Sequence, residues 1–291
     1  MGSRPPAEAA ARTGHGRVLA AAADAAAAAF AEAKASLPAQ ELSREVGIGG
    51  DGTPTSRLDE IVDAAVLDAA RPFGVNILSE EAGWVDRGSA VTLVVDPVDG
   101  TANALAGVPL CTFSGAIVVD GTPVEALTRW LDTGRDWAGR RGQATGAQPG
   151  QERADTGPWR TTGRTRLEGA AISLLRPQPA TWPAWQRIAE RSARVRILSC
   201  STLEAILACT GAIDAFADPG GDVHRYVDLA AALVYADVAG AVVADAFGRP
   251  VDFGTDPTRR WSGIVAATGE LAAELAAVIS DGASGGERHA S

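Results

Sequence analysis

The sequence predicts a layered α/β fold (α+β layered), and three observations point to it. An alanine-rich segment from Arg17 to Ala35 favours a long helix. Segments rich in β-branched residues follow in the first half, and the second half alternates strand patterns with helix patterns, as layered α/β proteins do. With 291 residues, the chain has room for one large domain or for two closely packed subdomains.

The first half is predicted to contain two helices and several strands. The second helix begins just beyond Pro54, which cannot lie inside a helix, and its apolar residues recur at three- and four-residue steps up to Ala70. Before it, Gly47 to Gly52 is interpreted as a flexible loop. Asp120-Gly121 is expected to close a hairpin. The predicted strands are Val75–Leu78, Val91–Val95 and Thr112–Val119.

The second half is predicted to follow a long surface connection from Gly142 to Gly163, which is poor in apolar residues. We place the subdomain boundary there, with residues 1–160 carrying most candidate ligands and 161–291 forming an α/β subdomain. Residues 1–16 and 280–291 are expected to be frayed or disordered. The predicted strands are 170–174, 195–198, 213–216 and 241–244, and the helices are 184–193, 203–209 and 227–239.

Composition excludes several classes of function. The net charge of −10 argues against a nucleic-acid polymer as partner, because phosphate contacts need a basic patch. No apolar stretch is long enough for a membrane span, so no membrane partner is expected. The three cysteines, Cys111, Cys200 and Cys209, are too scattered for a disulfide framework or a thiolate zinc site. These features fit a cytoplasmic protein.

Two apparent motifs lack the context that their chemistry needs. Residues 47–52 contain the glycine pattern of a dinucleotide-binding loop, but the preceding Glu41 to Val46 is mostly polar rather than an apolar strand. Residues 282–286 spell a nucleophile elbow, but they lie in the Gly/Ser-rich tail with no strand before them. We interpret both as flexible segments.

The strongest motif is Asp96-Pro97-Val98-Asp99-Gly100-Thr101, which directly follows the predicted strand Val91–Val95. Ligands bind at the carboxyl ends of strands in open α/β sheets. Two buried carboxylates need a positive partner, and no lysine or histidine lies nearby in the sequence. A hard cation such as Mg²⁺ would satisfy them, whereas an acidic surface turn would explain Asp-Gly but not Thr101.

Three further acidic positions could join this site. Glu80-Glu81 ends another short β segment, although adjacent acids often belong to a solvated surface. Asp59 and Asp228 each open a predicted helix, where the helix dipole alone could explain an acid. The small residues after Asp228 would let its helix pack closely beneath the site.

Together these residues resemble the inositol monophosphatase superfamily of Mg²⁺-dependent, lithium-sensitive phosphatases, which includes fructose-1,6-bisphosphatase relatives. Asp96 to Asn103 matches the motif Asp-Pro-Ile/Val-Asp-Gly-Thr-Thr/Ala-Asn. Three moderately specific elements match in order: Thr53 to Asp59, Ser79-Glu80-Glu81, and Val227 to Ala232. Ala104 and Val227 replace aromatic residues of the family, which affects the expected substrate more than the reaction.

The resemblance implies the roles of the site residues. Glu80, Asp96 and the Val98 carbonyl would bind one Mg²⁺, and Asp96, Asp99 and Asp228 a second, with two or three ions in total. Thr101, oriented by Asp59, would position the nucleophilic water, and Glu80 would contribute to catalysis. Backbone N–H groups of Gly100 and Thr101 would hold the phosphate. The resemblance also implies an alternating α-β-α-β-α sandwich of the sugar-phosphatase type and a homodimer.

The expected function is a Mg²⁺-dependent phosphomonoesterase acting on a small phosphorylated sugar, cyclitol or nucleotide by in-line attack of a metal-activated water. A 3′(2′)-nucleotide phosphatase of the same superfamily and a degenerate, non-catalytic relative with a binding or regulatory role stay open. A haloacid-dehalogenase-type phosphatase is disfavoured, since it needs Asp-x-Asp-x-Thr and two residues separate Asp96 from Asp99 here.

The roles of Arg225 and His224, which precede Asp228 in the sequence, stay open. Arg225 could bind a second phosphate or a carboxylate of the substrate, or it could form a surface ion pair with Asp222 or Asp218. His224 could contact the substrate or lie at the surface.

Overall fold

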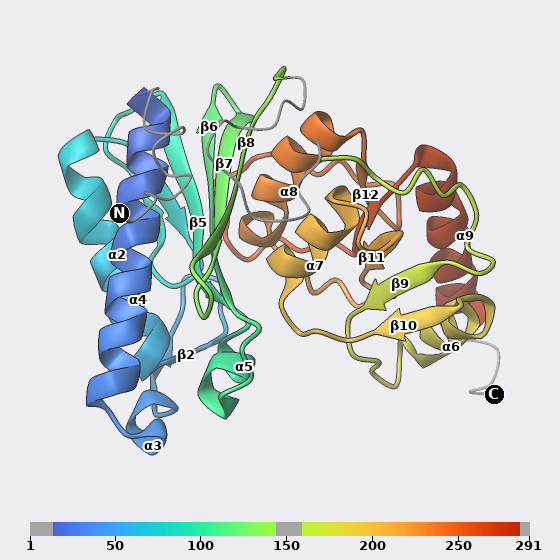
Figure 1. The fold of residues 1–291 in the computed structure, drawn as a ribbon, viewed down its shortest axis with the longest axis horizontal. Coiled ribbons are helices and arrows are strands. Elements are labelled where there is room, and N and C mark those ends of the chain that lie inside the picture. The colour runs from blue at the N-terminus through green and yellow to red at the C-terminus, as the bar shows by residue number, and fades with distance from the viewer. Residues whose placement is uncertain (1–13, 144–158, 286–291) are drawn as a thin grey trace, which may run out of the picture.

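A computed structural model describes residues 14–143 and 159–285. Two β-sheets alternate with layers of helices, which cover both outer faces and fill the space between the sheets (Figure 1). This arrangement confirms the predicted layered fold and its α-β-α-β-α order. Among the described residues, no helix is both long and apolar enough to cross a membrane.

The first sheet has six strands in the order β4-β3-β5-β6-β7-β8. β3 pairs in parallel with β5, and the other neighbours are antiparallel. The three predicted strands and the hairpin are present, but β5 continues to Asp99 through residues that were predicted to form a turn. The edge strands β4 and β8 were not predicted. The bounds are β3 Asn76–Ser79, β4 Gly83–Val85, β5 Val91–Asp99, β6 Thr112–Val119, β7 Thr122–Trp130 and β8 Arg135–Arg140.

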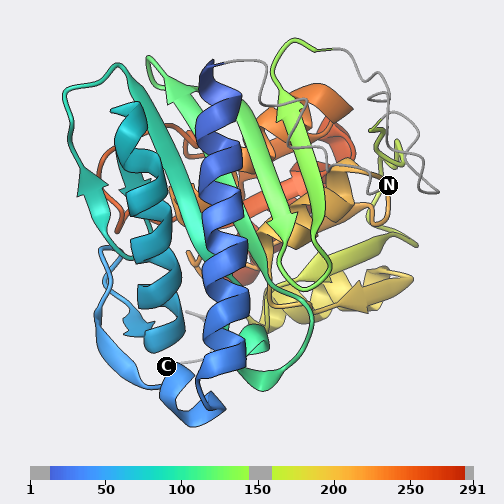
Figure 2. The ribbon, with the colours of Figure 1, turned by 60° about the vertical axis from the view of Figure 1, so that its left-hand side comes forward.

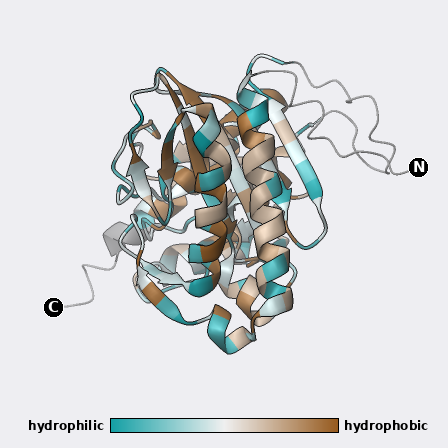
Figure 3. Cartoon of the chain, turned by 90° about the vertical axis from the view of Figure 1, so that its left-hand side faces the viewer, coloured by the Kyte–Doolittle hydropathy of each residue, from teal (hydrophilic) through white to brown (hydrophobic). Residues whose placement is uncertain are grey.

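Two helices, α2 (Gly14–Ser36) and α4 (Arg57–Ala70), lie side by side over the outer face of this sheet (Figures 2 and 3). Leu58, Val62 and Val66 on the predicted apolar face of α4 are fully buried, whereas Ile61, Ala65 and Ala69 are half-buried. A short helix, α3 (Ala39–Leu42), follows α2, and a 3₁₀ turn, η1 (Arg71–Phe73), ends α4.

The segment before α4 differs from its prediction as a flexible loop. β1 (Glu45–Ile48) and β2 (Pro54–Ser56) form an antiparallel ribbon, and residues 49–53 make the turn between them. The turn packs tightly against residues 80–83, because Gly50 donates a backbone hydrogen bond to Glu81 and a Cβ on Gly50 would lie 2.4 Å from Gly83. The glycines therefore permit close packing here.

Helices α7 (Ser201–Cys209) and α8 (Tyr226–Ala239) lie between the two sheets (Figure 1). The small side chains of the buried residues Ala230, Ala231 and Ala232 allow α8 to pack closely between the sheets. This helix contacts β5, β6 and β7 of the first sheet and β12 and β13 of the second. The packing of α8 thus places residues 226–239 against β5, the strand that ends in the predicted motif.

The second sheet has the order β10-β9-β11-β13-β12, with helices α6 and α9 on its outer side. β13 and α9 were not predicted, and α9 corrects the expected disorder for residues 280–285, while residues 286–291 lie outside the described residues. The bounds are β9 Ala171–Leu174, α6 Trp182–Arg191, β10 Arg194–Arg196, β11 Ala215–Ala217, β12 Val242–Asp245, β13 Gly263–Ala266 and α9 Gly269–Gly285.

The predicted surface connection is only partly described. Residues 144–158 lie outside the described residues, and residues 159–163 have no regular secondary structure. Trp159 packs edge-on against Tyr235 of α8, with ring centroids 4.9 Å apart. The frayed start predicted for residues 1–16 is wrong for residues 14–16, which belong to α2, and the rest of that segment is also outside the described residues.

Candidate active site

The end of β5 carries the first two acids of the site. Residues three apart in a regular strand point to opposite faces of a sheet. Here Asp96 pairs with Ser114 and Asp99 pairs with Thr112, so β5 has one extra residue over this interval. Such a bulge re-aims side chains, and it explains how both carboxylates reach one cluster.

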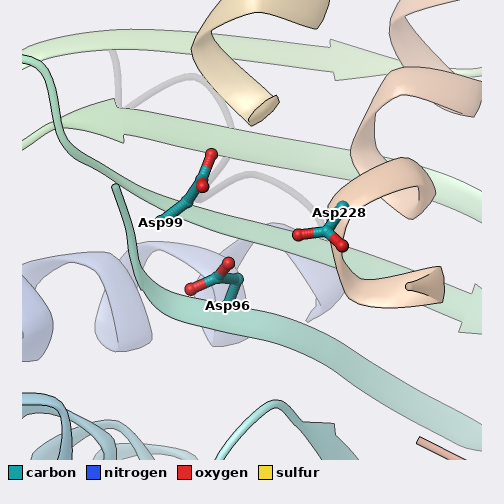
Figure 4. A group of neighbouring side chains, drawn as sticks. All are labelled: Asp96, Asp99 and Asp228. Atoms are coloured by element: carbon teal, nitrogen blue, oxygen red, sulfur yellow. The ribbon is translucent and has the colours of Figure 1, made fainter. Parts of the chain in front are cut away.

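Asp228 completes a cluster of three carboxylates from two distant parts of the chain. One carboxylate oxygen from each of Asp96, Asp99 and Asp228 lies within 4.8 Å of the others (Figure 4). All three side chains are buried. Burial and the neighbouring Glu80 raise the pKa of Asp96 well above its ordinary value, and burial with Asp228 raises the pKa of Asp99.

The cluster fits a hard cation. Asp96 Oδ1 accepts the Val98 N–H at 3.1 Å, whereas the buried Asp96 Oδ2 has no hydrogen-bond partner. An orphaned, buried carboxylate oxygen facing other carboxylates is costly unless a cation satisfies it. The donors are all oxygens, which suits Mg²⁺ better than a softer transition metal.

Asp99 is held by the first turn of α7. Its Oδ2 atom accepts the Thr202 N–H at 2.6 Å, the Thr202 hydroxyl at 2.8 Å and the Cys200 thiol at 3.3 Å. Asn103 also donates to the carbonyls of Leu198 and Ser199, so two residues of the Asp96–Asn103 motif contact the same loop. The C-terminal part of the chain therefore orients a candidate cation ligand of the N-terminal part.

Thr101 and Asp59 form the second part of the site. The Thr101 hydroxyl lies 2.8 Å from Asp59 Oδ1 and 2.9 Å from the Val98 carbonyl. Asp59 is fixed at the start of α4 by a capping box with Ser56, whose hydroxyl donates to Asp59 Oδ2 at 2.8 Å. Burial outweighs these hydrogen bonds and raises the pKa of Asp59. The predicted proximity of Asp59 and Thr101 is present.

Gly100 lies between the two parts of the site. Its φ of +86° is in the left-handed region, and a Cβ there would meet the Leu110 carbonyl at 2.7 Å. Both facts require glycine. Gly100 caps α5 (Thr101–Ala106), so its N–H and that of Thr101 are at the start of a helix, as the phosphate-binding prediction needs.

The ion-pair partners of Arg225 differ from those expected from the sequence. It contacts neither Asp222, which pairs with Arg249, nor Asp218, which accepts backbone N–H groups. Instead it forms ion pairs with Asp51, Glu80 and Asp228, and its side chain is only 15% exposed. Asp51, Glu80 and Asp228 therefore do have a basic partner, and it lies far from Asp51 and Glu80 in the sequence.

The charge of Arg225 acts unequally on the site. The pKa of Asp228 is lowered because Arg225 outweighs the effect of burial. Burial, only partly offset by Arg225, raises the pKa of Glu80 to about 7.

His224 is buried, so the alternative that it lies at the surface is wrong. It is 1% exposed, its Nδ1 accepts the Gly263 N–H at 3.2 Å, and its ring packs edge-on against Phe216.

Asp51, Arg260 and Thr202 belong to the site but were not predicted. Asp51 lies in the turn that we interpreted as a flexible loop, although its place in Asp-Gly-Thr-Pro-Thr, just ahead of Asp59, was an available signal. Arg260 donates to the carbonyl of Asp51 at 2.9 Å and to its carboxylate at 3.3 Å. No local pattern marks Arg260 or Thr202, because their partners lie more than 100 residues away.

The carboxylate cluster could hold the metal ion that a metal-dependent phosphomonoesterase needs, and the fold is one that solved inositol monophosphatases have. The sequence matches the inositol monophosphatase family over residues 16–283, so the chain belongs to this family. The predicted resemblance and the predicted enzyme class are confirmed.

Individual relatives agree with this membership. The chain is 29% identical to a fructose-1,6-bisphosphatase of Pyrococcus furiosus over 229 residues, covering 78% of this chain and 84% of that protein. It is 28% identical to an inositol-1-monophosphatase of Aeropyrum pernix, covering 76% and 84%. The extragenic suppressor protein suhB of Bartonella henselae shares the fold, with a TM-score of 0.72, 22% identity and coverage of 90% and 96%.

Proposed function

We propose that this protein is a Mg²⁺-dependent phosphomonoesterase that hydrolyses a small phosphorylated sugar or cyclitol. The observation that carries the proposal is the cluster of Asp96, Asp99 and Asp228 with its orphaned Asp96 oxygen, next to Thr101 and Asp59. The names of the relatives, a fructose-1,6-bisphosphatase and an inositol-1-monophosphatase, support the substrate class. The separate sheets on either side of residues 144–158 support a division near residue 160.

The cation ligands would be Asp96, Asp99, Asp228, Glu80 and the Val98 carbonyl. Bound Mg²⁺ supplies Lewis-acid polarisation of the phosphoryl group and neutralises charge on the attacking and leaving oxygens. Phosphate monoesters are among the slowest compounds to hydrolyse, so a general base alone, worth about 10²–10⁴-fold, is insufficient.

Thr101 and Asp59 would handle the proton of the attacking water. The Thr101 oxygen accepts a hydrogen bond from the water, and the Thr101 hydroxyl proton is directed to Asp59 Oδ1 at 2.8 Å. As the water oxygen attacks phosphorus in line and the ester oxygen leaves, one water proton moves to Thr101 and the Thr101 proton moves to Asp59. The raised pKa of Asp59 favours this role, because a base is most effective when its pKa approaches the working pH.

The phosphate would lie against the backbone N–H groups of Gly100 and Thr101. Arg225 is the candidate second anchor for the substrate, since a guanidinium binds phosphate oxygens through two parallel hydrogen bonds.

The proposal is tested with a panel of phosphate esters: inositol phosphate, fructose bisphosphate, histidinol phosphate and nucleotide 2′- and 3′-phosphates. Activity should disappear with EDTA and return with Mg²⁺. Thr101→Ala should lower kcat with a smaller effect on KM, and Thr101→Ser, which keeps the hydroxyl, should restore most of it. Full activity after exhaustive chelation would reject the proposal, and preference for a nucleotide would revise the substrate class.

A further inference from the structure

Arg225 places one guanidinium among carboxylates from three separate segments. Its Nε and Nη2 atoms donate to the two oxygens of Asp228, each at 3.0 Å. Its Nη1 atom donates to Asp51 at 2.7 Å and also to Glu80. Asp51 lies in the turn between β1 and β2, Glu80 follows β3, and Asp228 is in the first turn of α8. One side-chain cation therefore joins all three segments.

Two of these carboxylates, Glu80 and Asp228, are also proposed cation ligands. An oxygen that accepts a charged N–H has less negative potential to offer a second cation, and two cations a few ångströms apart repel each other. The guanidinium and a divalent ion therefore compete for the same side of the site. Asp96 and Asp99 form no hydrogen bond with Arg225 among the described contacts, so the competition is concentrated at Glu80 and Asp228.

We propose that Arg225 is a resident cation of the site, which occupies the space between Glu80, Asp51 and Asp228 until a divalent ion takes it and then turns to the substrate phosphate. This inference rests on the proposed function, and it adds how metal and substrate binding are coupled. Arg225 keeps a charged partner in both states, because the phosphate replaces the carboxylates that it leaves.

The surroundings of Arg225 permit this exchange. Its side chain is 15% exposed, so the guanidinium is not sealed from an incoming ligand. Asp51 keeps a basic partner when Arg225 leaves, because Arg260 contacts both its carboxylate and its carbonyl. The carboxylate of Asp228 also retains the Arg225 backbone N–H as a donor, at 2.6 Å. Removing the guanidinium therefore leaves neither acid without a hydrogen bond.

Calorimetric titration of the full-length, substrate-free protein with Mg²⁺ tests the competition. Arg225→Gln should bind Mg²⁺ more tightly than the wild type, by roughly tenfold, within the range of measured couplings between sites. Arg225→Lys keeps the positive charge and should bind Mg²⁺ about as the wild type does. Arg191→Gln is the matched control, because Arg191 pairs with Glu168 and Glu274 and ends α6, on the outer side of the second sheet (Figure 1). It removes one charge and should leave Mg²⁺ affinity unchanged.

Titration with inorganic phosphate at saturating Mg²⁺ tests the second half of the proposal. Both Arg225→Gln and Arg225→Lys should bind phosphate more weakly, because neither offers the two-pronged guanidinium. The inference is overturned if folded Arg225→Gln binds Mg²⁺ no more tightly than the wild type, or if both variants bind phosphate as the wild type does. If Arg225→Gln does not fold, unchanged phosphate affinity in Arg225→Lys overturns it.

Failure of this inference is distinguishable from failure of the proposed function. A wild-type protein that hydrolyses none of the phosphate esters removes the proposed function, whatever the titrations give. An active wild-type enzyme whose Arg225→Gln variant shows unchanged Mg²⁺ affinity removes only the resident-cation role.

Discussion

Residues 14–143 and residues 159–285 both contribute acids to the site, but the two regions treat their acids differently. In the first region, Asp96 has a single backbone donor on one oxygen and no partner on the other. In the second, Asp228 receives the guanidinium of Arg225 on both oxygens. The pKa of Asp96 is consequently raised by burial and by its acidic neighbours, while the pKa of Asp228 is lowered.

The difference shows how the site divides its work. The six-stranded sheet and α4 hold a group of acids close together, and close acids repel one another. Helices α7 and α8 bring the groups that compensate, namely the donors of Thr202 on Asp99 and the charge of Arg225. The acids of the first region therefore favour the binding of a cation. The donors and the positive charge of the second region set how strongly they favour it.

The largest expected effect comes from replacing one acid in each region. Asp96→Asn and Asp228→Asn should both reduce activity by at least about 10²–10³-fold, the loss typical of one electrostatic stabiliser in a buried site. The increase in Tm caused by Mg²⁺, which reflects binding to the folded state, should shrink in both variants. Steady-state kinetics and thermal unfolding with and without Mg²⁺ measure these losses.

The two variants should differ in stability without metal. Asp96→Asn removes a like charge from the cluster, so its metal-free Tm should not fall below that of the wild type. Asp228→Asn leaves Arg225 without its two-pronged partner, and hydrogen bonds to charged groups are worth about 1.5–3 kcal/mol. Its metal-free Tm should therefore fall. Equal changes in the two variants would contradict the contrast between the regions.

Local sequence patterns predicted most of the first region of the site and less of the second. Asp96 to Thr101 form a continuous strand, bulge and helix start, so one short segment carries their geometry. Asp59 is the acid of a Ser-x-x-Asp pattern at the start of a helix. Arg225 and Asp51, by contrast, are 174 residues apart, and only the packing of α8 against the first sheet brings them together.

The missed elements have similar explanations. In α9, Leu271, Leu275 and Ile279 recur every fourth residue and are buried, but the glycines and serines that follow obscured this helical pattern. The strand β1 has mostly exposed residues, so no alternation of apolar and polar residues marks it.

A smaller effect is expected from the contact that joins the two regions. Thr202→Val removes the hydroxyl that donates to Asp99 at 2.8 Å and keeps the backbone donor at 2.6 Å. Loss of one hydrogen bond to a charged group should cost about 1.5 kcal/mol, which corresponds to roughly a tenfold lower kcat. Kinetics at several Mg²⁺ concentrations should also show weaker Mg²⁺ activation, and Thr202→Ser should restore both quantities.

Thr112→Val is the matched control for this contact. The Thr112 hydroxyl lies 2.6 Å from the Thr202 hydroxyl, and the described bonds do not connect it directly to Asp99. Its loss should therefore affect kcat less than Thr202→Val does. If Thr112→Val were the more damaging of the two, general packing between β6 and α7 would explain the effect better than orientation of Asp99.

The smallest effect on activity is expected at Asp63, one turn beyond Asp59 on α4. Burial raises the pKa of Asp63 from 3.8 to about 6, although the Ser79 hydroxyl donates to it. Because the folded protein binds this proton more tightly than the unfolded chain, the stabilising effect is present at low pH and is lost as the pH rises from about 4 to 6. At about 1.4 kcal/mol per pH unit, ionised Asp63 should cost up to about 3 kcal/mol at neutral pH.

Asp63→Asn should therefore flatten the dependence of unfolding free energy on pH between 4 and 6 and increase stability at pH 7, with kcat nearly unchanged. Asp68→Asn, an exposed position on the same helix, should change neither quantity. Urea unfolding at several pH values, together with kcat at pH 7, measures both effects. A large loss of kcat in Asp63→Asn would mean that the proposed proton relay extends beyond Asp59 to Asp63. Within the first region, α4 would then contribute to the chemistry in addition to the carboxylates at the end of β5.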